Sequence, residues 1–209
     1  MDRLPDAMPD DSSAIASARR VVAACAGTDE YPDDHALRVA ECAALIADRL
    51  QVGDTTRRIV VQGALLHDVG KLVVDARVVS KPGPLSPAER REINRHPAQG
   101  ALLVRGAVEP EVIEVVHGHH ERWDGSGYPR GLRENQIPLA ARIVAVADVF
   151  LAMLEPRPYR GALTRDAAHD ELKRAAGSHL DPACVAALLA VTGSDPDVPY
   201  EPIPGLETV

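Results

Sequence analysis

Apolar residues in this 209-residue chain recur at helical spacing, and no segment alternates apolar and polar residues over a convincing length. The runs Leu72-Val73-Val74 and Val78-Val79 are too short, and too close to glycine and proline, to anchor a sheet. Hydrophobic residues make up 45% of the sequence but aromatic residues only 3%, so a core must be built from Ala, Val, Leu and Ile. Such a core favours closely packed helices, and the sequence predicts an all-α fold.

The helices that we expect alternate with short connections. They cover residues 12–26, 34–51, 54–67, 86–105, 109–119, 138–154, 164–176 and 181–191. Ser86-Pro87-Ala88-Glu89 combines an N-cap, a first-position proline and a third-position glutamate, and Asp181-Pro182 repeats the first two features. Pro97 should kink or divide the fourth helix. The proline-containing ends, 1–11 and 193–209, are predicted to be tails on a single domain over 12–192.

Net charge, the lack of long apolar runs and the cysteine positions indicate which partners and which compartment to expect. A formal net charge of −8 argues against general binding of DNA or anionic membranes. No apolar run approaches the roughly 18 residues of a membrane span, and the acidic N-terminus is unlike a signal peptide. Cys25, Cys42 and Cys184 lie among apolar residues at helical spacing, which is typical of reduced core residues. We therefore expect a cytoplasmic protein without membrane insertion.

Two segments carry groups suited to metal chemistry. The first runs from His117 through His119-His120 to Gly127-Tyr128-Pro129, joining adjacent imidazoles to a glycine-rich turn. The second is His67-Asp68-Val69-Gly70-Lys71, which follows an apolar run. A second His-Asp pair, His169-Asp170, has no such context and is interpreted as accidental. Together the two segments indicate a metal-assisted hydrolase.

These segments belong to a longer ordered set. His67-Asp68-Val69-Gly70-Lys71 is followed by Lys81-Pro82-Gly83, His96-Pro97, the adjacent histidines with Gly-Tyr-Pro, Val146-Ala147-Asp148, and Arg157-Pro158-Tyr159-Arg160. The set resembles the HD-GYP family of bacterial cyclic di-GMP phosphodiesterases, a branch of the HD phosphohydrolases, from about Tyr31 to about Leu189. The resemblance implies a single HD-type helical bundle of about seven to eight helices, with the Gly-Tyr-Pro loop over a metal site. It also implies hydrolysis of cyclic di-GMP to pGpG, with slower onward hydrolysis to GMP left open.

The resemblance further implies the metal ligands. Two divalent ions held by imidazole and carboxylate groups can share a bridging hydroxide that attacks phosphorus in line. The matching positions are His35, His67, Asp68, His96, His119, His120 and Asp148. By analogy the first three and Asp148 would hold one ion, the remaining histidines would hold the second, and Asp68 would bridge them.

Residue chemistry adds two points about the metals. A carboxylate in so apolar a helix as the one containing Asp148 needs a partner to offset its desolvation, and a cation is the simplest one. Some relatives bind a third metal through a glutamate at the position of Tyr31, and a phenol is a poor replacement, so we expect two ions. Iron or manganese follows from the family, because these ligand types alone do not separate Fe, Mn, Co, Ni and Zn.

Catalytic and substrate-binding roles are also expected from the resemblance. Asp68 and Lys71 are assigned to catalysis, because the lysine follows the His-Asp pair by one helical turn and can stabilise the attacking group or a phosphate oxygen. Arg157 and Arg160 would bind substrate phosphate. Tyr128 would pack on a guanine or donate its hydroxyl. The loop residues are Asp124, Gly125, Gly127, Tyr128 and Pro129, a surface that family members are thought to use to meet diguanylate cyclase (GGDEF) domains.

One departure keeps alternatives open. The family usually reads Val-Phe-Asp-Ala-Leu-Thr-Ser after the equivalent of Asp148, whereas this chain has Val149-Phe150-Leu151-Ala152-Met153-Leu154-Glu155. Leu151 thus replaces an aspartate, which puts substrate positioning in doubt. A hydrolase of another cyclic dinucleotide or nucleotide is one alternative, and a catalytically weak cyclic di-GMP sensor or adaptor is the other.

Overall fold

The computed structural model describes residues 12–26, 34–155 and 161–193. Apart from Gly193, the two predicted tails lie outside these residues. So do Tyr31, Arg157 and Arg160, whose predicted roles are not addressed by the structure.

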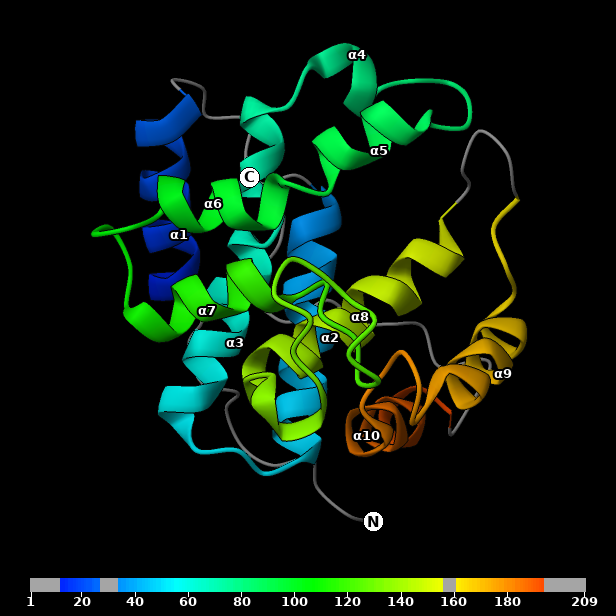
Figure 1. Cartoon of the computed structure of the whole chain (residues 1–209). Helices are drawn as coiled ribbons and strands as arrows, with labels where there is room; N and C mark the ends of the chain where they lie inside the picture. Colours follow the sequence, from blue (N-terminus) through cyan, green and yellow to red (C-terminus); the bar gives the residue numbers. More distant parts are fainter. Residues whose placement is uncertain (1–11, 27–33, 156–160, 194–209) are drawn as a thin grey trace.

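The described residues form ten α-helices and two short 3₁₀ helices (Figure 1). The α-helices are α1 (Ser12–Ala26), α2 (Asp34–Arg49), α3 (Asp54–Leu66), α4 (Ala76–Val79), α5 (Pro87–Ile93), α6 (His96–Leu103), α7 (Pro110–Gly118), α8 (Leu139–Leu154), α9 (Arg165–Ala175) and α10 (Pro182–Thr192). The 3₁₀ helices are η1 (Val69–Val73) and η2 (Glu134–Gln136). Within these ranges β pairing is limited to one isolated bridge between Ala176 and Leu180. The all-α prediction is confirmed.

The helix count exceeds the expected seven to eight for two local reasons. The predicted fourth helix is divided into α5 and α6 by a break at Asn94 and Arg95, and Pro97 lies in the first turn of α6. The predicted capping box at Ser86 and Glu89 is present at the start of α5. The unpredicted α4 is a single turn whose N-cap, Asp75, accepts a hydrogen bond from a backbone N–H.

Helix α2 lies near the centre of the molecule, in contact with α3, α8 and α10 (Figure 1). Its buried surface is rich in alanine, including Ala40, Ala43, Ala44 and Ala47, which allows neighbouring helices to approach closely. The rest of the core is mostly valine, leucine and isoleucine. Cys42 and Cys184 are buried free thiols, as expected. None of the helices in the described ranges has the length and apolarity needed to span a membrane.

Several helix ends converge on one region. His35 lies in the first turn of α2, His67 directly follows α3, His96 begins α6, and His119 directly follows α7. A close contact between η1 and α6 helps to bring these ends together. A Cβ atom placed on Gly70 would lie 2.0 Å from the His96 carbonyl oxygen, so only glycine permits this approach.

Candidate metal centre

The structure brings all seven predicted ligand side chains into one cluster. The ligand atoms of His35, His67 and Asp68 lie within 4.8 Å of one another, and those of His96, His119 and His120 form a second such group. Asp148, the seventh, lies 3.2 Å from the first group through its Oδ1 atom and His35 Nε2. The two groups match the division of the ligands between two ions that the family resemblance implies. That these residues bind metal stays a prediction.

Asp68 lies between the two groups. Its Oδ2 atom is 3.3 Å from His67 Nε2, and its Oδ1 atom is 3.3 Å from His96 Nε2. One carboxylate oxygen therefore faces each group, which is the arrangement that a bridging ligand requires. Lys71 forms an ion pair with Oδ2 at the edge of the cluster.

Three of the histidines are oriented by their own backbone. His67, His96 and His119 each donate Nδ1–H to the carbonyl oxygen three residues earlier, at 2.6, 2.7 and 2.8 Å. Since a carbonyl oxygen can only accept, the proton of each neutral ring is on Nδ1 and the lone pair is on Nε2. Each of these rings, when neutral, therefore presents the lone pair of Nε2 to the cluster.

The arrangement leaves polar atoms that a cation would satisfy. His67 Nε2 is buried and makes no hydrogen bond with described residues. His96 Nε2 and His119 Nε2 face each other at 3.2 Å, although neither can donate to the other while both rings carry their proton on Nδ1. The donor set and these atoms fit divalent first-row ions.

The electrostatics of the two groups differ. Burial lowers the pKa of His119 well below its ordinary value, and it lowers the pKa of His120 to about 4, so both rings are neutral near pH 7. Burial also disfavours protonation of His67, but the negative charges of Asp68 and Asp148 outweigh it and raise the pKa of His67 to about 9. Two carboxylates therefore create a local field that attracts a proton or a metal ion.

The Gly-Tyr-Pro loop is anchored beside the second group. The Tyr128 ring lies against His120, with centroids 5.0 Å apart, and the Tyr128 N–H donates to the His120 carbonyl oxygen. A Cβ atom on Gly127 would lie 2.3 Å from the Arg122 backbone nitrogen, so glycine is required here by close packing. Gly125 has a φ of 82°, which glycine adopts without strain. The loop thus holds Tyr128 at the edge of the histidine cluster.

Two further contacts fix the course of this loop. Asp124 Oδ1 accepts hydrogen bonds from the backbone N–H and hydroxyl of Ser126, closing the turn. The Glu121 side chain is fully buried and accepts from the backbone N–H groups of Arg130 (2.7 Å) and Leu132 (3.0 Å). Pro129 follows Tyr128 through a cis peptide bond.

Sequence reasoning missed three residues that shape the site. Gly70, Glu121 and Glu155 position other groups, and their partners are distant in sequence or become adjacent only in the folded loop. The sequence shows Glu121 only as one carboxylate in the polar stretch before Gly-Tyr-Pro, and its burial is seen only in the structure. Glu155 accepts a hydrogen bond from His35 Nδ1 at 3.0 Å across 120 residues, which no local pattern signals.

The remaining three histidines lie outside the cluster. His169 packs against Phe150 and hydrogen-bonds the Thr192 hydroxyl at 2.9 Å. His117 is half-buried in α7, and His179 is exposed before α10. Leu151 is partly buried and packs against the core, so it does not supply the polar group that the family has there.

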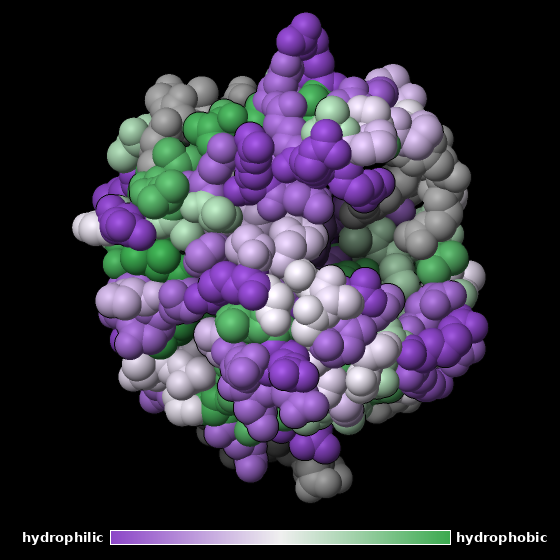
Figure 2. Space-filling view, viewed as in Figure 1, coloured by the Kyte–Doolittle hydropathy of each residue, from purple (hydrophilic) through white to green (hydrophobic). Residues whose placement is uncertain are grey.

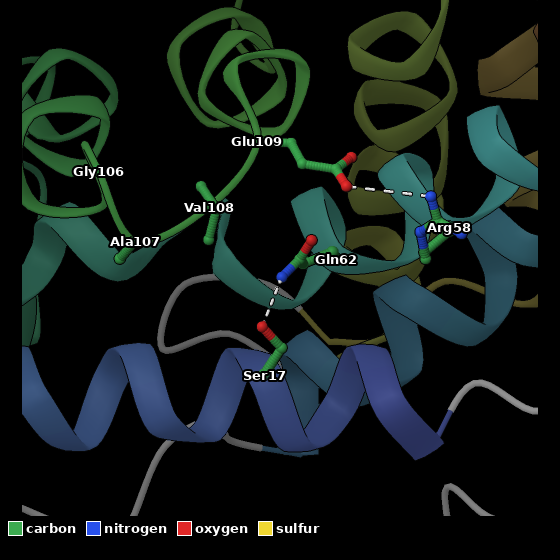
Figure 3. Close-up of a pocket in the computed structure, with 7 residues that line it drawn as sticks. All are labelled: Ser17, Arg58, Gln62, Gly106, Ala107, Val108 and Glu109. Atoms are coloured by element: carbon green, nitrogen blue, oxygen red, sulfur yellow. Dashed lines mark hydrogen bonds and ion pairs between the residues drawn. The ribbon is translucent and has the colours of Figure 1, made fainter.

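The surface view shows a hollow beside the loop after α7, between α5 and the end of α8 (Figure 2). A separate cavity of about 460 Å³ is lined by residues from α1, α3 and the connection from α6 to α7 (Figure 3). It contains none of the seven clustered residues. Two contacts link its polar groups: Gln62 donates to the Ser17 hydroxyl at 3.0 Å, and Arg58 Nη2 lies 3.9 Å from Glu109 Oε1.

Comparison with known proteins places the chain in a family. The sequence matches the HD domain family over residues 18–184. The chain belongs to this family and, within it, to the HD-GYP group. The HD domain is associated with divalent metal ions, and the two candidate ligand groups described above agree with that association.

Similar proteins include two curated phosphodiesterases. The chain is 46% identical over 156 residues to the cyclic di-GMP phosphodiesterase response regulator RpfG of Xanthomonas campestris pv. campestris, covering 73% of this chain and 41% of RpfG. It is 38% identical over 168 residues to 3'3'-cGAMP-specific phosphodiesterase 3 of Vibrio cholerae, covering 80% of this chain and 36% of that protein. The chain thus spans less than half the length of either relative.

A solved structure shows the same fold. The HDG"Y"P protein Bd1817 of Bdellovibrio bacteriovorus superposes with a TM-score of 0.66 at 22% identity, covering 87% of this chain and 62% of Bd1817.

Proposed function

We propose that residues 12–192 form a metal-dependent phosphodiesterase domain that hydrolyses cyclic di-GMP to pGpG. The observation that carries the proposal is the pair of ligand groups that share Asp68, because one oxygen of this carboxylate faces each group. The identity with RpfG, which is named a cyclic di-GMP phosphodiesterase, supports the substrate.

The seven clustered residues would hold two divalent ions, with iron or manganese as the proposed metals. His35, His67, Asp68 and Asp148 are assigned to one ion, and His96, His119 and His120 to the other, with Asp68 shared. When bound, such ions polarise a phosphoryl oxygen and activate a water molecule as the nucleophile.

The protein groups around the cluster perform the remaining tasks. The Lys71 ammonium, held at the edge of the cluster by its ion pair with Asp68, stabilises negative charge that develops on a phosphate oxygen. Tyr128, held against His120 by the loop, presents an aromatic face and a hydroxyl to the substrate. Arg157 and Arg160 follow α8 in sequence and are assigned to the phosphates, to which guanidinium groups bind well.

The exposed turn of the loop is a further proposed contact surface. Asp124 and Ser126 are exposed and hydrogen-bonded to each other, while Glu121 anchors the loop from within. This surface is assigned to GGDEF-domain partners, in agreement with the family resemblance.

A second candidate substrate is 3'3'-cGAMP. It is favoured by the 38% identity with a phosphodiesterase named as specific for that nucleotide. Leu151 is apolar and packs against the core, whereas the HD-GYP pattern has aspartate at this position. We assign to this difference any change in which substrate base or phosphate the site prefers.

A substrate panel separates the two candidates. Protein purified without air, with its metal content measured, is incubated with cyclic di-GMP or 3'3'-cGAMP, and the linear products are quantified by chromatography. We expect pGpG to form with a kcat/KM at least about tenfold higher than that for 3'3'-cGAMP, a difference of about 1.4 kcal/mol in transition-state stabilisation. The reverse preference would establish the second candidate. Tight binding of cyclic di-GMP by metal-loaded protein without turnover would contradict both and favour the sensor hypothesis.

A further inference from the structure

His35 differs from the other oriented histidines in the partner of its second ring nitrogen. It is the second residue of α2, so no helical turn of α2 precedes it to offer a carbonyl oxygen. Its Nδ1 atom instead hydrogen-bonds Glu155 Oε1 at 3.0 Å. The ring is therefore oriented by a side chain from another part of the chain.

Both hydrogen-bond partners of this imidazole come from α8 and its end. Asp148, within α8, approaches Nε2 at 3.2 Å, and Glu155, the residue that ends the helix, approaches Nδ1 at 3.0 Å. The two carboxylates are seven residues apart, about two helical turns, and therefore lie on the same side of the helix. The His35 ring is held between them.

A cation from α2 fixes the glutamate. Arg38 donates from Nη2 to the same Glu155 Oε1 atom at 2.6 Å, and its Nε–H reaches the Asp34 carbonyl oxygen at 3.3 Å. The Glu155 side chain is only 23% exposed, so this contact is partly shielded from water. The guanidinium thus holds the carboxylate in place against His35.

Glu155 contacts the ring nitrogen of His35 that faces away from the proposed metal site. Nδ1 and Nε2 lie on opposite edges of an imidazole ring, so a carboxylate bound at Nδ1 is directed away from an ion bound at Nε2. We infer that Glu155 is a positioning residue that fixes the proton of His35 on Nδ1 and directs Nε2 toward the metal. The inference rests on the proposed function, because it assumes that the cluster binds metal.

Glu155 directly follows α8 and stands two residues before Arg157 in the sequence. The carboxylate that holds His35 therefore precedes, in the sequence, the segment assigned to substrate phosphate.

The test measures metal affinity without substrate. Metal-stripped parent, Glu155→Gln and Glu155→Ala proteins are titrated with Co²⁺, and the absorption of the bound ions is recorded. Loss of a carboxylate partner behind a histidine ligand typically weakens metal binding about 10–100-fold. We expect a loss of this size for one of the two ions, larger in Glu155→Ala, with a changed absorption band and an unchanged second ion. Glu171→Gln, which removes an equal charge from an exposed ion pair with Arg174, should match the parent.

A double-mutant cycle separates positioning from other effects. If Glu155 acts through His35, adding Glu155→Gln to His35→Ala should cause no further loss of Co²⁺ affinity. A further loss of similar size would overturn the inference, since Glu155 would then act on the ion or the fold directly. The parent could bind two ions and hydrolyse cyclic di-GMP while both Glu155 variants kept its Co²⁺ affinity and absorption. This result would overturn the positioning role of Glu155 and leave the proposed function standing. A parent that binds no ion would overturn the proposed function as well.

Discussion

Four histidines of the cluster are oriented for metal binding by the hydrogen-bond partners of their Nδ1 atoms. His67, His96 and His119 use the carbonyl oxygen one helical turn earlier, whereas His35 uses Glu155. In each case the second ring nitrogen is committed to a partner, so the ligand nitrogen has a defined direction. The buried rings of His67, His96 and His119 carry Nε2 atoms that a cation would satisfy, and this ties metal binding to the fold.

Glu41 permits a test of burial energetics away from the proposed ligands. It lies in α2 with 4% of its surface exposed, and burial raises its pKa from 4.5 to about 7 against the opposing charge of Arg38. A carboxyl with a raised folded-state pKa contributes stability that is complete below its unfolded pKa and is lost as the pH rises through the folded pKa.

We therefore predict that the free energy of unfolding of the parent falls relative to that of Glu41→Gln between about pH 4.5 and pH 8. The relative change should approach about 3 kcal/mol. Urea denaturation of both proteins across this pH range measures it, with Glu171→Gln as the exposed control. Parallel pH profiles for the parent and Glu41→Gln would show that the carboxyl is not desolvated in the folded protein.

At the scale of secondary structure, most of the helices and their boundaries could be predicted from the sequence. Caps and apolar periodicity predicted most helix boundaries to within a few residues, because those signals are local. The 3₁₀ helix η1 and its contact with α6 were not predictable. They depend on Gly70 meeting the backbone of His96 and Gly100, residues that lie next to it only in the folded chain.

Gly70→Ala should disrupt this contact. Its Cβ atom would lie 2.0 Å from the His96 carbonyl oxygen and 2.6 Å from the Gly100 nitrogen, so the backbones of η1 and α6 must separate. We predict a loss of stability of about 1–3 kcal/mol or more, and weaker metal binding because Asp68 would move relative to His96. Urea denaturation and Co²⁺ titration measure the two effects. Gly53→Ala, where nothing lies within 4 Å of the added atom, is the matched control. Equal behaviour of the two variants would contradict the account of this contact.

At the scale of the whole molecule, distant segments assemble one site. The ligand set could be proposed from the sequence because the family pattern gives ligand types in a fixed order, and the fold then brings Asp68, His96 and Asp148 together. Glu121 and Glu155 could not be proposed in this way. Glu121 accepts from backbone N–H groups of its own loop and Glu155 from the His35 ring, and both contacts exist only in the packed structure.

The number of bound metal ions depends on the whole set of ligands that the folded chain brings together. Two groups of ligand atoms are present in the described residues, and Tyr31 stands where some relatives place the glutamate of a third site. We predict two tightly bound divalent ions per chain. Elemental analysis of protein purified without air, with protein concentration determined by amino-acid analysis, measures the ratio. Three fully occupied ions with protein ligands would contradict this prediction.

The most direct test of the central claim is the effect of Asp68→Ala on metal content and hydrolysis measured in the same preparation. Asp68 is the residue with one oxygen facing each ligand group, whereas the core is formed by apolar residues that do not depend on it. We predict a helical, folded variant, verified by circular dichroism, that loses bound metal and pGpG formation together. Cyclic di-GMP turnover near the parent rate by Asp68→Ala would contradict the assignment of this cluster as a two-metal phosphodiesterase site.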